Sequence, residues 1–211
     1  WPKVGASGKV FCGFSDFTAF NCAALSQGGL PTLHGPMLAV DFGDGEPDAY
    51  MLGHFAASLW GTEDSETVEC DHGCGTAAIA GTLWGGNLSM LAHLAGTPYL
   101  PAVDGGLLYV EEIAEEPYAI ERLFYQLHHA GILARCRAVL LGDFADCVPA
   151  NPARYPYSMD EVAEALRTIA PCPVLPGLPF GHVARKLTLP FGSAALLTLQ
   201  PGSYTLSWPG L

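Results

Sequence analysis

Residues 9–29 of the chain read KVFCGFSDFTAFNCAALSQGG. The first part is a short apolar run closed by Gly13 and small polar residues, which is typical of a buried strand that ends in a turn. Residues 17–26 are compatible with a helix, and the Gly-Gly pair that follows is a helix stop signal. This stretch therefore predicts a strand, a sharp turn and a helix, with Ser15 at the end of the strand.

The alternation of strands and helices continues along the chain. Ser158 and Glu161 match a capping box, a typical start of a helix. Short, turn-separated β-like segments follow from 187 to 208. We expect buried strands at residues 107–110 and 138–142, and helices at residues 49–60, 87–95 and 162–169 and from Pro117 onward. Strands that alternate with helices predict an α/β architecture.

The composition is that of an acidic globular chain. Of the 211 residues, 50% are hydrophobic and 14% are charged, which excludes disorder as the main state. The net charge of −12 would repel phosphate backbones and anionic lipid headgroups, so we expect no nucleic-acid partner and no membrane partner. No apolar run reaches the roughly 20 residues that span a bilayer, so we expect a soluble chain.

The cysteines and the first residues bear on the cellular setting. Seven cysteines, an odd number, are scattered along a chain large enough to fold without disulfides. This usage favours reduced thiols and a cytoplasmic location. The chain starts at Trp1, without an initiator Met and without the pattern of a signal peptide, which indicates an internal segment.

Three polar residues follow the ends of apolar strands or turns, namely Ser15, Glu111 and His182. The loops beyond the carboxyl ends of the strands form the cleft in α/β enzymes. A serine hydroxyl needs a neutral imidazole to take its proton, and a carboxylate to hold the imidazole in the right tautomer. The order Ser, acid, His is also the one that α/β hydrolases use, which favours a catalytic triad.

Each of these residues also has a structural interpretation. The motif around Ser15 has Phe17 where the G-x-S-x-G nucleophile motif requires its second Gly, so Ser15 alone also fits a helix N-cap. Glu111 alone fits a solvated charge at a strand end, and His182 alone fits a hydrogen-bonded loop histidine. Singly, each of these signals is weak, so both interpretations stay open at this point.

Two further segments suggest other chemistry. Residues 70–74, Cys-Asp-His-Gly-Cys, carry two thiols and an imidazole, but no second Cys/His pair at a usual spacing supplies the fourth ligand of a structural zinc site. Residues 81–87 are Gly-rich before an expected helix, yet they lack the Lys of a phosphate loop and the G-x-G-x-x-G spacing. Zinc and nucleotide binding stay minor alternatives.

Seven ordered blocks resemble the LD-carboxypeptidases, the S66 serine peptidases that act on muropeptides. Position by position, the resemblance implies Ser15 as nucleophile, Glu111 as the acid and His182 as the base. The backbone N–H of Asp16 would then supply part of the oxyanion hole. The blocks are GFSDFTA (13–19), HGPM (34–37), LWGGNL (83–88), GTP (96–98), VEEIAEEPY (110–118), QLHHAGIL (126–133) and GLPFGH (177–182).

The resemblance implies the organisation of the chain. Residues 1–45 would be the remnant of a flavodoxin-like nucleophile domain, residues 46–80 an acidic connector of unassigned role, and residues 81–211 a C-terminal swivelling β/β/α domain. Family members carry about a hundred further residues before the Ser block, with an Arg-Gly-Gly turn whose backbone N–H completes the oxyanion hole. The chain is therefore expected to be a fragment.

The resemblance also implies the reaction. A serine carboxypeptidase of this family releases terminal D-Ala from a murein tetrapeptide in peptidoglycan recycling, without a metal or other cofactor and as a homodimer. Trp84 and Asn87 are candidate substrate contacts, although Asn87 equally fits a helix cap. The alternatives are a same-fold peptidase acting on an acyl-nucleotide peptide antibiotic in self-immunity, and a non-catalytic muropeptide-binding domain.

Overall fold

The computed structural model describes residues 1–43, 45–71 and 73–210. Its strands form a three-stranded sheet in the order β1-β2-β8 and a seven-stranded sheet in the order β3-β10-β9-β4-β5-β6-β7. The strands are β1 (Cys12–Gly13), β2 (Thr32–His34), β3 (Asp64–Glu69), β4 (Ala77–Asn87), β5 (Gly106–Ile113), β6 (Cys136–Ala145), β7 (Val174–Leu175), β8 (Leu189–Phe191), β9 (Ala194–Gln200) and β10 (Ser203–Trp208).

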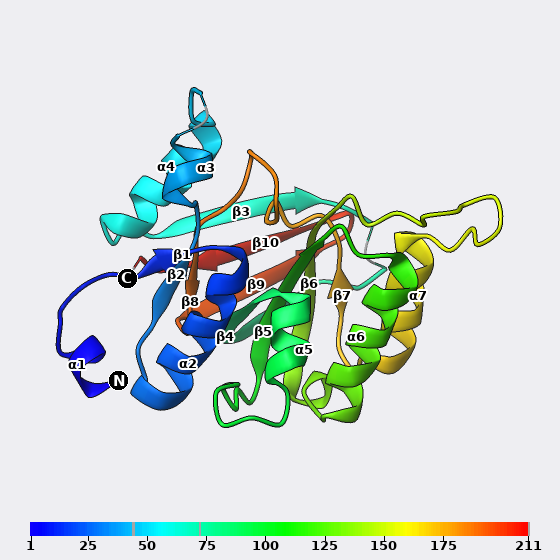
Figure 1. The fold of residues 1–211 in the computed structure, drawn as a ribbon, viewed down its shortest axis with the longest axis horizontal. Helices are drawn as coiled ribbons and strands as arrows, with labels where there is room; N and C mark the ends of the chain where they lie inside the picture. Colours follow the sequence, from blue (N-terminus) through cyan, green and yellow to red (C-terminus); the bar gives the residue numbers. More distant parts are fainter. Residues whose placement is uncertain (44, 72, 211) are drawn as a thin grey trace.

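A row of helices covers one face of the parallel strands (Figure 1): α2 packs against α5, α5 against α6, and α6 against α7. Helices α3 and α4 stand apart from this row, at the top of the view. Of the described helices, none is long and apolar enough to cross a bilayer. The helices are α1 (Pro2–Gly5), α2 (Thr18–Gly28), α3 (Leu38–Asp41), α4 (Ala49–Leu59), α5 (Leu88–Leu94), α6 (Pro117–His129) and α7 (Met159–Ile169), with 3-10 turns η1 (Ser15–Phe17) and η2 (Leu133–Arg135).

The strand pairing in the large sheet changes from antiparallel to parallel along β4. Residues 77–82 of β4 pair antiparallel with β9, whereas residues 83–87 pair parallel with β5. Strand β5 is buried at almost every position, as expected for a parallel strand covered on both faces, while β10 alternates between buried and half-buried positions. The mixed sheet with its helices confirms the predicted α/β class.

The small sheet joins the two ends of the chain. Strand β1 pairs parallel with β2, and β2 pairs antiparallel with β8, which comes from residues 189–191. Directly after β8, Gly192 N donates to the carbonyl oxygen of Leu83 in β4. The late part of the chain therefore builds part of the sheet that carries the nucleophile turn. The division at residues 45 and 80 stays a prediction.

Local signals placed most helices correctly. Ser158 Oγ accepts from Glu161 N, and the Glu161 carboxylate accepts from Ser158 N, so the predicted capping box opens α7. Pro117 lies in the first turn of α6, where its missing N–H costs no hydrogen bond. Asp48 caps α4 by accepting from Met51 N. These helix starts are therefore confirmed.

The expected acidic connector is partly a strand, because residues 64–69 form the edge strand β3. Two of its carboxylates face α4, where His54 Nδ1 lies 2.6 Å from Asp64 Oδ2 and His54 Nε2 lies 3.9 Å from Glu66 Oε2. The inner side of this strand is therefore acidic as well as apolar, which hid the alternation that marks a strand. Charged edge strands also resist pairing with other chains.

Candidate active site

Ser15 occupies a sharp turn between β1 and α2. Its φ of +56° is uncommon for a residue with a side chain, and this strained strand-to-helix turn is how nucleophile elbows expose their hydroxyl. The Phe17 side chain, which replaces the second Gly of the generic motif, lies over Gly13, where an added β-carbon would come within 2.3 Å of its ring. The turn therefore requires glycine at position 13, the first Gly of the motif, but accommodates Phe17 at the second.

Glu111 lies at the carboxyl end of β5, opposite Asn87 of β4, and its side chain is fully buried. At this point β5 and β6 change register, because Val110 pairs with Leu141 but Glu112 pairs with Phe144. Glu111 therefore faces two residues of β6, which is a β-bulge.

The bulge leaves β6 free to bind the segment that carries His182. Asp143 N donates to the carbonyl oxygen of Phe180 at 2.7 Å, and Leu178 N donates to the carbonyl oxygen of Leu141 at 3.0 Å. These backbone hydrogen bonds fix the chain just before His182. The position of His182 thus depends on the irregular end of β6.

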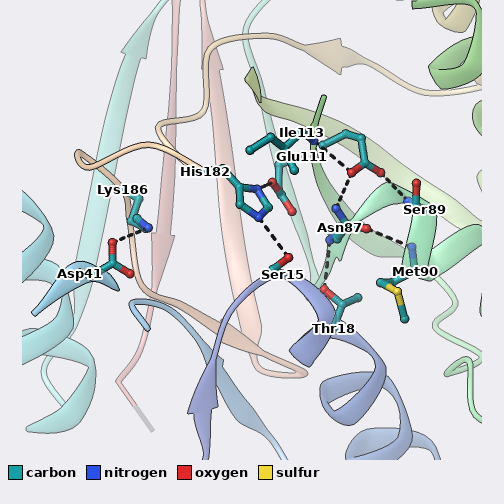
Figure 2. Close-up of polar contacts among 11 residues, drawn as sticks. Ser15, Thr18, Asp41, Asn87, Ser89, Met90, Glu111, Ile113, His182 and Lys186 are labelled. Atoms are coloured by element: carbon teal, nitrogen blue, oxygen red, sulfur yellow. Dashed lines mark hydrogen bonds and ion pairs between the residues drawn. The ribbon is translucent and has the colours of Figure 1, made fainter. Parts of the chain in front are cut away.

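Ser15, His182 and Glu111 form one chain of hydrogen bonds (Figure 2). His182 Nδ1 lies 2.7 Å from Glu111 Oε2, and His182 Nε2 lies 3.0 Å from Ser15 Oγ. Because a carboxylate only accepts, Nδ1 carries the proton, and Nε2 of the neutral ring accepts from the Ser15 hydroxyl. The three residues predicted from strand ends are therefore brought together, and the Ser15 side chain makes no helix-cap hydrogen bond.

Electrostatics separate two histidines at the site. The hydrogen bond with Glu111 raises the pKa of His182, against an opposing effect of partial burial. His34, at the end of β2, is fully buried, and burial lowers its pKa to about 3. His34 Nδ1 lies 3.2 Å from Tyr109 Oη. The site therefore favours the protonated form of His182 and the neutral form of His34.

The raised pKa of His182 predicts the pH profile of any reaction that uses it as a base. The ring must be neutral to take a proton from Ser15, so activity should rise with pH through the pKa of His182 and fall as the pH drops below it. We expect this acidic limb of kcat/KM above the usual histidine value of 6.5. Steady-state rates measured about every pH unit between roughly pH 5 and 9 check this. An acidic limb with its midpoint below pH 6.5 would contradict the prediction.

Glu112 is a site residue that the sequence reasoning did not select. Its side chain is almost fully buried, and its carboxylate accepts from Asn87 Nδ2 at 2.7 Å, Ser89 N at 2.8 Å and Ile113 N at 3.0 Å. Asn87 in turn caps α5 by accepting from Met90 N. The signal available in the sequence was two adjacent Glu residues at the end of an apolar strand.

Thr18 at the start of α2 joins the nucleophile turn to the large sheet. Thr18 Oγ1 accepts from Asn87 N at 3.1 Å. Gly86 makes this approach possible, because its φ is +126° and an added β-carbon would lie 2.4 Å from His34 Cε1 and 2.5 Å from Thr18 Oγ1. The absence of a side chain at Gly86 therefore lets the two sheets meet at the site.

Replacing Gly86 with Ala should destabilise the protein by about 2–5 kcal/mol, since it adds both backbone strain and a close contact. Urea unfolding measures this loss. Gly202→Ala is the matched control, because Gly202 also has a positive φ, of +80°, but has no atom within 4 Å of the added carbon. Equal losses for the two variants would show that close packing at Gly86 is unimportant.

The remaining predicted site residues lie in different surroundings. Trp84 is 1% exposed and belongs to the core, so its side chain offers no surface to a substrate, contrary to the expectation. Asp16 is exposed in the turn directly after Ser15, as the first acidic residue of η1. Asn87 is 5% exposed and serves as a helix cap, the second of its two predicted roles.

The structure also bears on the two alternative sites, the phosphate loop and the zinc site. Residues 81–87 form the second half of β4, so they are not a loop that wraps a phosphate. Of the Cys70 to Cys74 cluster, His72 lies outside the described residues. Across the described ranges, no group of three or more His, Cys, Asp or Glu side chains is arranged to hold a metal ion.

The α/β fold and the hydrogen-bonded Ser, His and Glu are together those of a hydrolase. Residues 80–197 match the family described as the LD-carboxypeptidase C-terminal domain, peptidase family S66. The chain therefore belongs to the LD-carboxypeptidase family.

Individual relatives agree with the family. The chain is similar to the crystal structure of a muramoyltetrapeptide carboxypeptidase from Oxalobacter formigenes, with 40% identity and a TM-score of 0.90, over 98% of this chain and 71% of that one. It is 34% identical to a Bacillus subtilis protein named as a probable murein peptide carboxypeptidase, over 90% of this chain and 60% of that protein. The microcin C7 self-immunity protein MccF, at 22% identity and a TM-score of 0.84, over 100% of this chain and 70% of that one, shares the fold.

The chain is shorter than these relatives. It spans 60 to 66% of the length of the curated relatives that it matches first. The activity of a whole protein of this family therefore comes to this chain only as a proposal.

Proposed function

We propose that the protein is a serine carboxypeptidase that releases the terminal D-Ala of murein tetrapeptides. The observation that carries the proposal is the chain of hydrogen bonds from Ser15 through His182 to Glu111, with Ser15 on a turn of positive φ. The substrate class comes from the relatives named as a muramoyltetrapeptide carboxypeptidase and a probable murein peptide carboxypeptidase.

In this mechanism Ser15 Oγ attacks the carbonyl carbon of the bond before D-Ala, and His182 Nε2 takes the hydroxyl proton. The buried Glu111 carboxylate stabilises the imidazolium that forms. His182 then gives this proton to the nitrogen of the leaving D-Ala, and it activates a water that hydrolyses the acyl-enzyme. Asp16, the residue after the nucleophile, would stabilise the oxyanion through its backbone N–H.

The test is D-Ala release. We would incubate the purified chain with L-Ala-γ-D-Glu-meso-diaminopimelate-D-Ala in excess EDTA and quantify D-Ala by mass spectrometry. A tetrapeptide that ends in L-Ala controls for stereochemistry, and a relative named for this activity serves as positive control. Release of D-Ala alone supports the proposal. No release where the positive control is active would contradict it for this chain.

The second candidate substrate is tested in parallel. Solved complexes of MccF contain aspartyl sulfamoyl adenosine, so calorimetry with this compound tests for recognition of an acyl-nucleotide. The relative with 40% identity is named as a muramoyltetrapeptide carboxypeptidase, which favours the cell-wall substrate. Tight binding of the nucleoside without D-Ala release would favour the alternative.

The setting and assembly belong to the same proposal. A cytoplasmic location is supported by Cys12, Cys22 and Cys136, none of which forms a disulfide bond. A homodimer is supported by two apolar side chains on the α3–α4 side, Leu38 and Trp60, that are 82% and 81% exposed. Light scattering measures the mass in solution.

A further inference from the structure

Lys186 is a buried cation close to the site that the mechanism does not use. It follows His182 by four residues, and its side chain is 4% exposed. Its Nζ donates to Asp41 Oδ1 at 2.7 Å, and the Asp41 side chain is 5% exposed (Figure 2). Buried charges persist only where they are paired, so this ion pair is a specific feature of the fold.

Phe14 connects this cation to the catalytic residues. Lys186 Nζ lies 4.6 Å from the centre of the Phe14 ring, within the range of a cation–π contact. The ring of His182 meets the same Phe14 ring edge-on, with the two centres 5.0 Å apart. Phe14 directly precedes Ser15, so one aromatic ring contacts the ammonium and the imidazole and joins the nucleophile.

Asp41 is itself held in place. Its Oδ2 accepts from Met37 N at 2.6 Å, at the start of α3. The segment after His182 is tied to α4 as well, because the Arg185 guanidinium lies 3.5 Å from the centre of the Tyr50 ring. The Lys186–Asp41 pair thus joins two anchored segments across the site.

We propose that Lys186 is a positioning residue, which with Asp41 clamps the loop of His182 against Phe14 and so holds the imidazole in line with Ser15. The inference rests on the proposed function, because it concerns the same base. It assigns a role to a buried ion pair that lies outside the Ser, His and Glu arrangement.

The charges around His182 predict a signature of this clamp. Glu111 and Glu112 approach His182 from β5, His34 from β2 and Lys186 from its own loop. The Glu111 hydrogen bond raises the pKa of His182, whereas the Lys186 charge lowers it. Loss of Lys186 should therefore raise the pKa of His182 further, in addition to loosening the ring.

The test begins with Lys186→Met. We expect kcat at the pH plateau to fall roughly 10- to 100-fold while KM changes by less than about threefold. The reason is that a misplaced base reduces stabilisation of the transition state more than it reduces substrate binding. The NMR titration of the His182 ring should move to higher pH. Lys9→Met makes the same substitution at an exposed residue and should change neither kcat nor the His182 titration.

A second variant separates positioning from folding. Asp41→Leu/Lys186→Met removes both charges together, which proteins often tolerate better than one unpaired buried charge. We expect a melting temperature near that of wild type with the same fall in kcat. A folded double variant with wild-type kcat and an unshifted His182 titration would overturn the inference.

The titration also separates this inference from the proposed function. It requires no substrate, so an unshifted His182 in Lys186→Met overturns the clamp even if wild type releases D-Ala. An inactive wild type with a shifted titration overturns the proposed substrate, and it supports the effect of the Lys186 charge on His182. Lys186→Arg keeps the charge and should restore part of kcat and the wild-type titration.

Discussion

Ser15→Ala is expected to lower D-Ala release by on the order of 10⁴-fold or more, because removal of the nucleophile leaves only binding and oxyanion stabilisation. The Ser15 hydroxyl lies 3.0 Å from His182 Nε2 (Figure 2). Single-turnover assays with excess enzyme would measure the residual rate. Activity above about one per cent of wild type would exclude Ser15 as the nucleophile.

The same variant should fold normally. Ser15 is partly exposed, and both Ser and Ala carry a β-carbon at its φ of +56°, so the backbone strain is unchanged. We expect a melting temperature close to that of wild type. Ser26→Ala on α2 is the matched control, since the Ser26 hydroxyl donates to the carbonyl oxygen of Tyr99 and should leave turnover intact.

Glu111→Gln has the second largest expected effect, a fall in kcat of about 10⁴-fold, the size seen when a triad carboxylate becomes an amide. The new amide can donate to His182 Nδ1, which shifts the ring proton to Nε2 and leaves no acceptor for the Ser15 proton. The change also removes the hydrogen bond that raises the pKa of His182. The acidic limb of kcat/KM should therefore move to lower pH.

Glu115→Gln is the matched control for this second prediction. Glu115 lies four residues further along the same acidic block and is exposed, outside the hydrogen bonds of Ser15 and His182. Rates and pH profiles of both variants, measured side by side, test the assignment. A large loss in Glu115→Gln with an active Glu111→Gln would transfer the role of the acid.

Local sequence signals anticipated much of the fold and the three central residues of the site. Gly pairs, Pro117 and the Ser158–Glu161 box act within one turn of a helix, so their effect is visible in the sequence. Ser15, Glu111 and His182 were found because parallel strands end on one edge of a sheet. Their catalytic roles stay predictions.

The missed features depend on contacts between distant residues. Residues 81–87 look like a Gly-rich loop in the sequence. In the structure, position 86 has room only for glycine because His34 and Thr18 lie next to it. Lys186 and Asp41 are separated by 145 positions, and nothing near either residue indicates its partner. Trp84 resembles an exposed aromatic contact in the sequence, but the fold buries it in the core. Such pairs become visible only once the chain has folded.

The return of β8 to the small sheet has a consequence for biosynthesis. Ser15 and His182 are separated by 167 positions, and β2 receives its β8 partner only when residues 189–191 have been made. A nascent chain on the ribosome therefore displays the nucleophile turn long before its base and its neighbouring strand exist. The proposed hydrolysis therefore requires synthesis of the chain at least as far as strand β8.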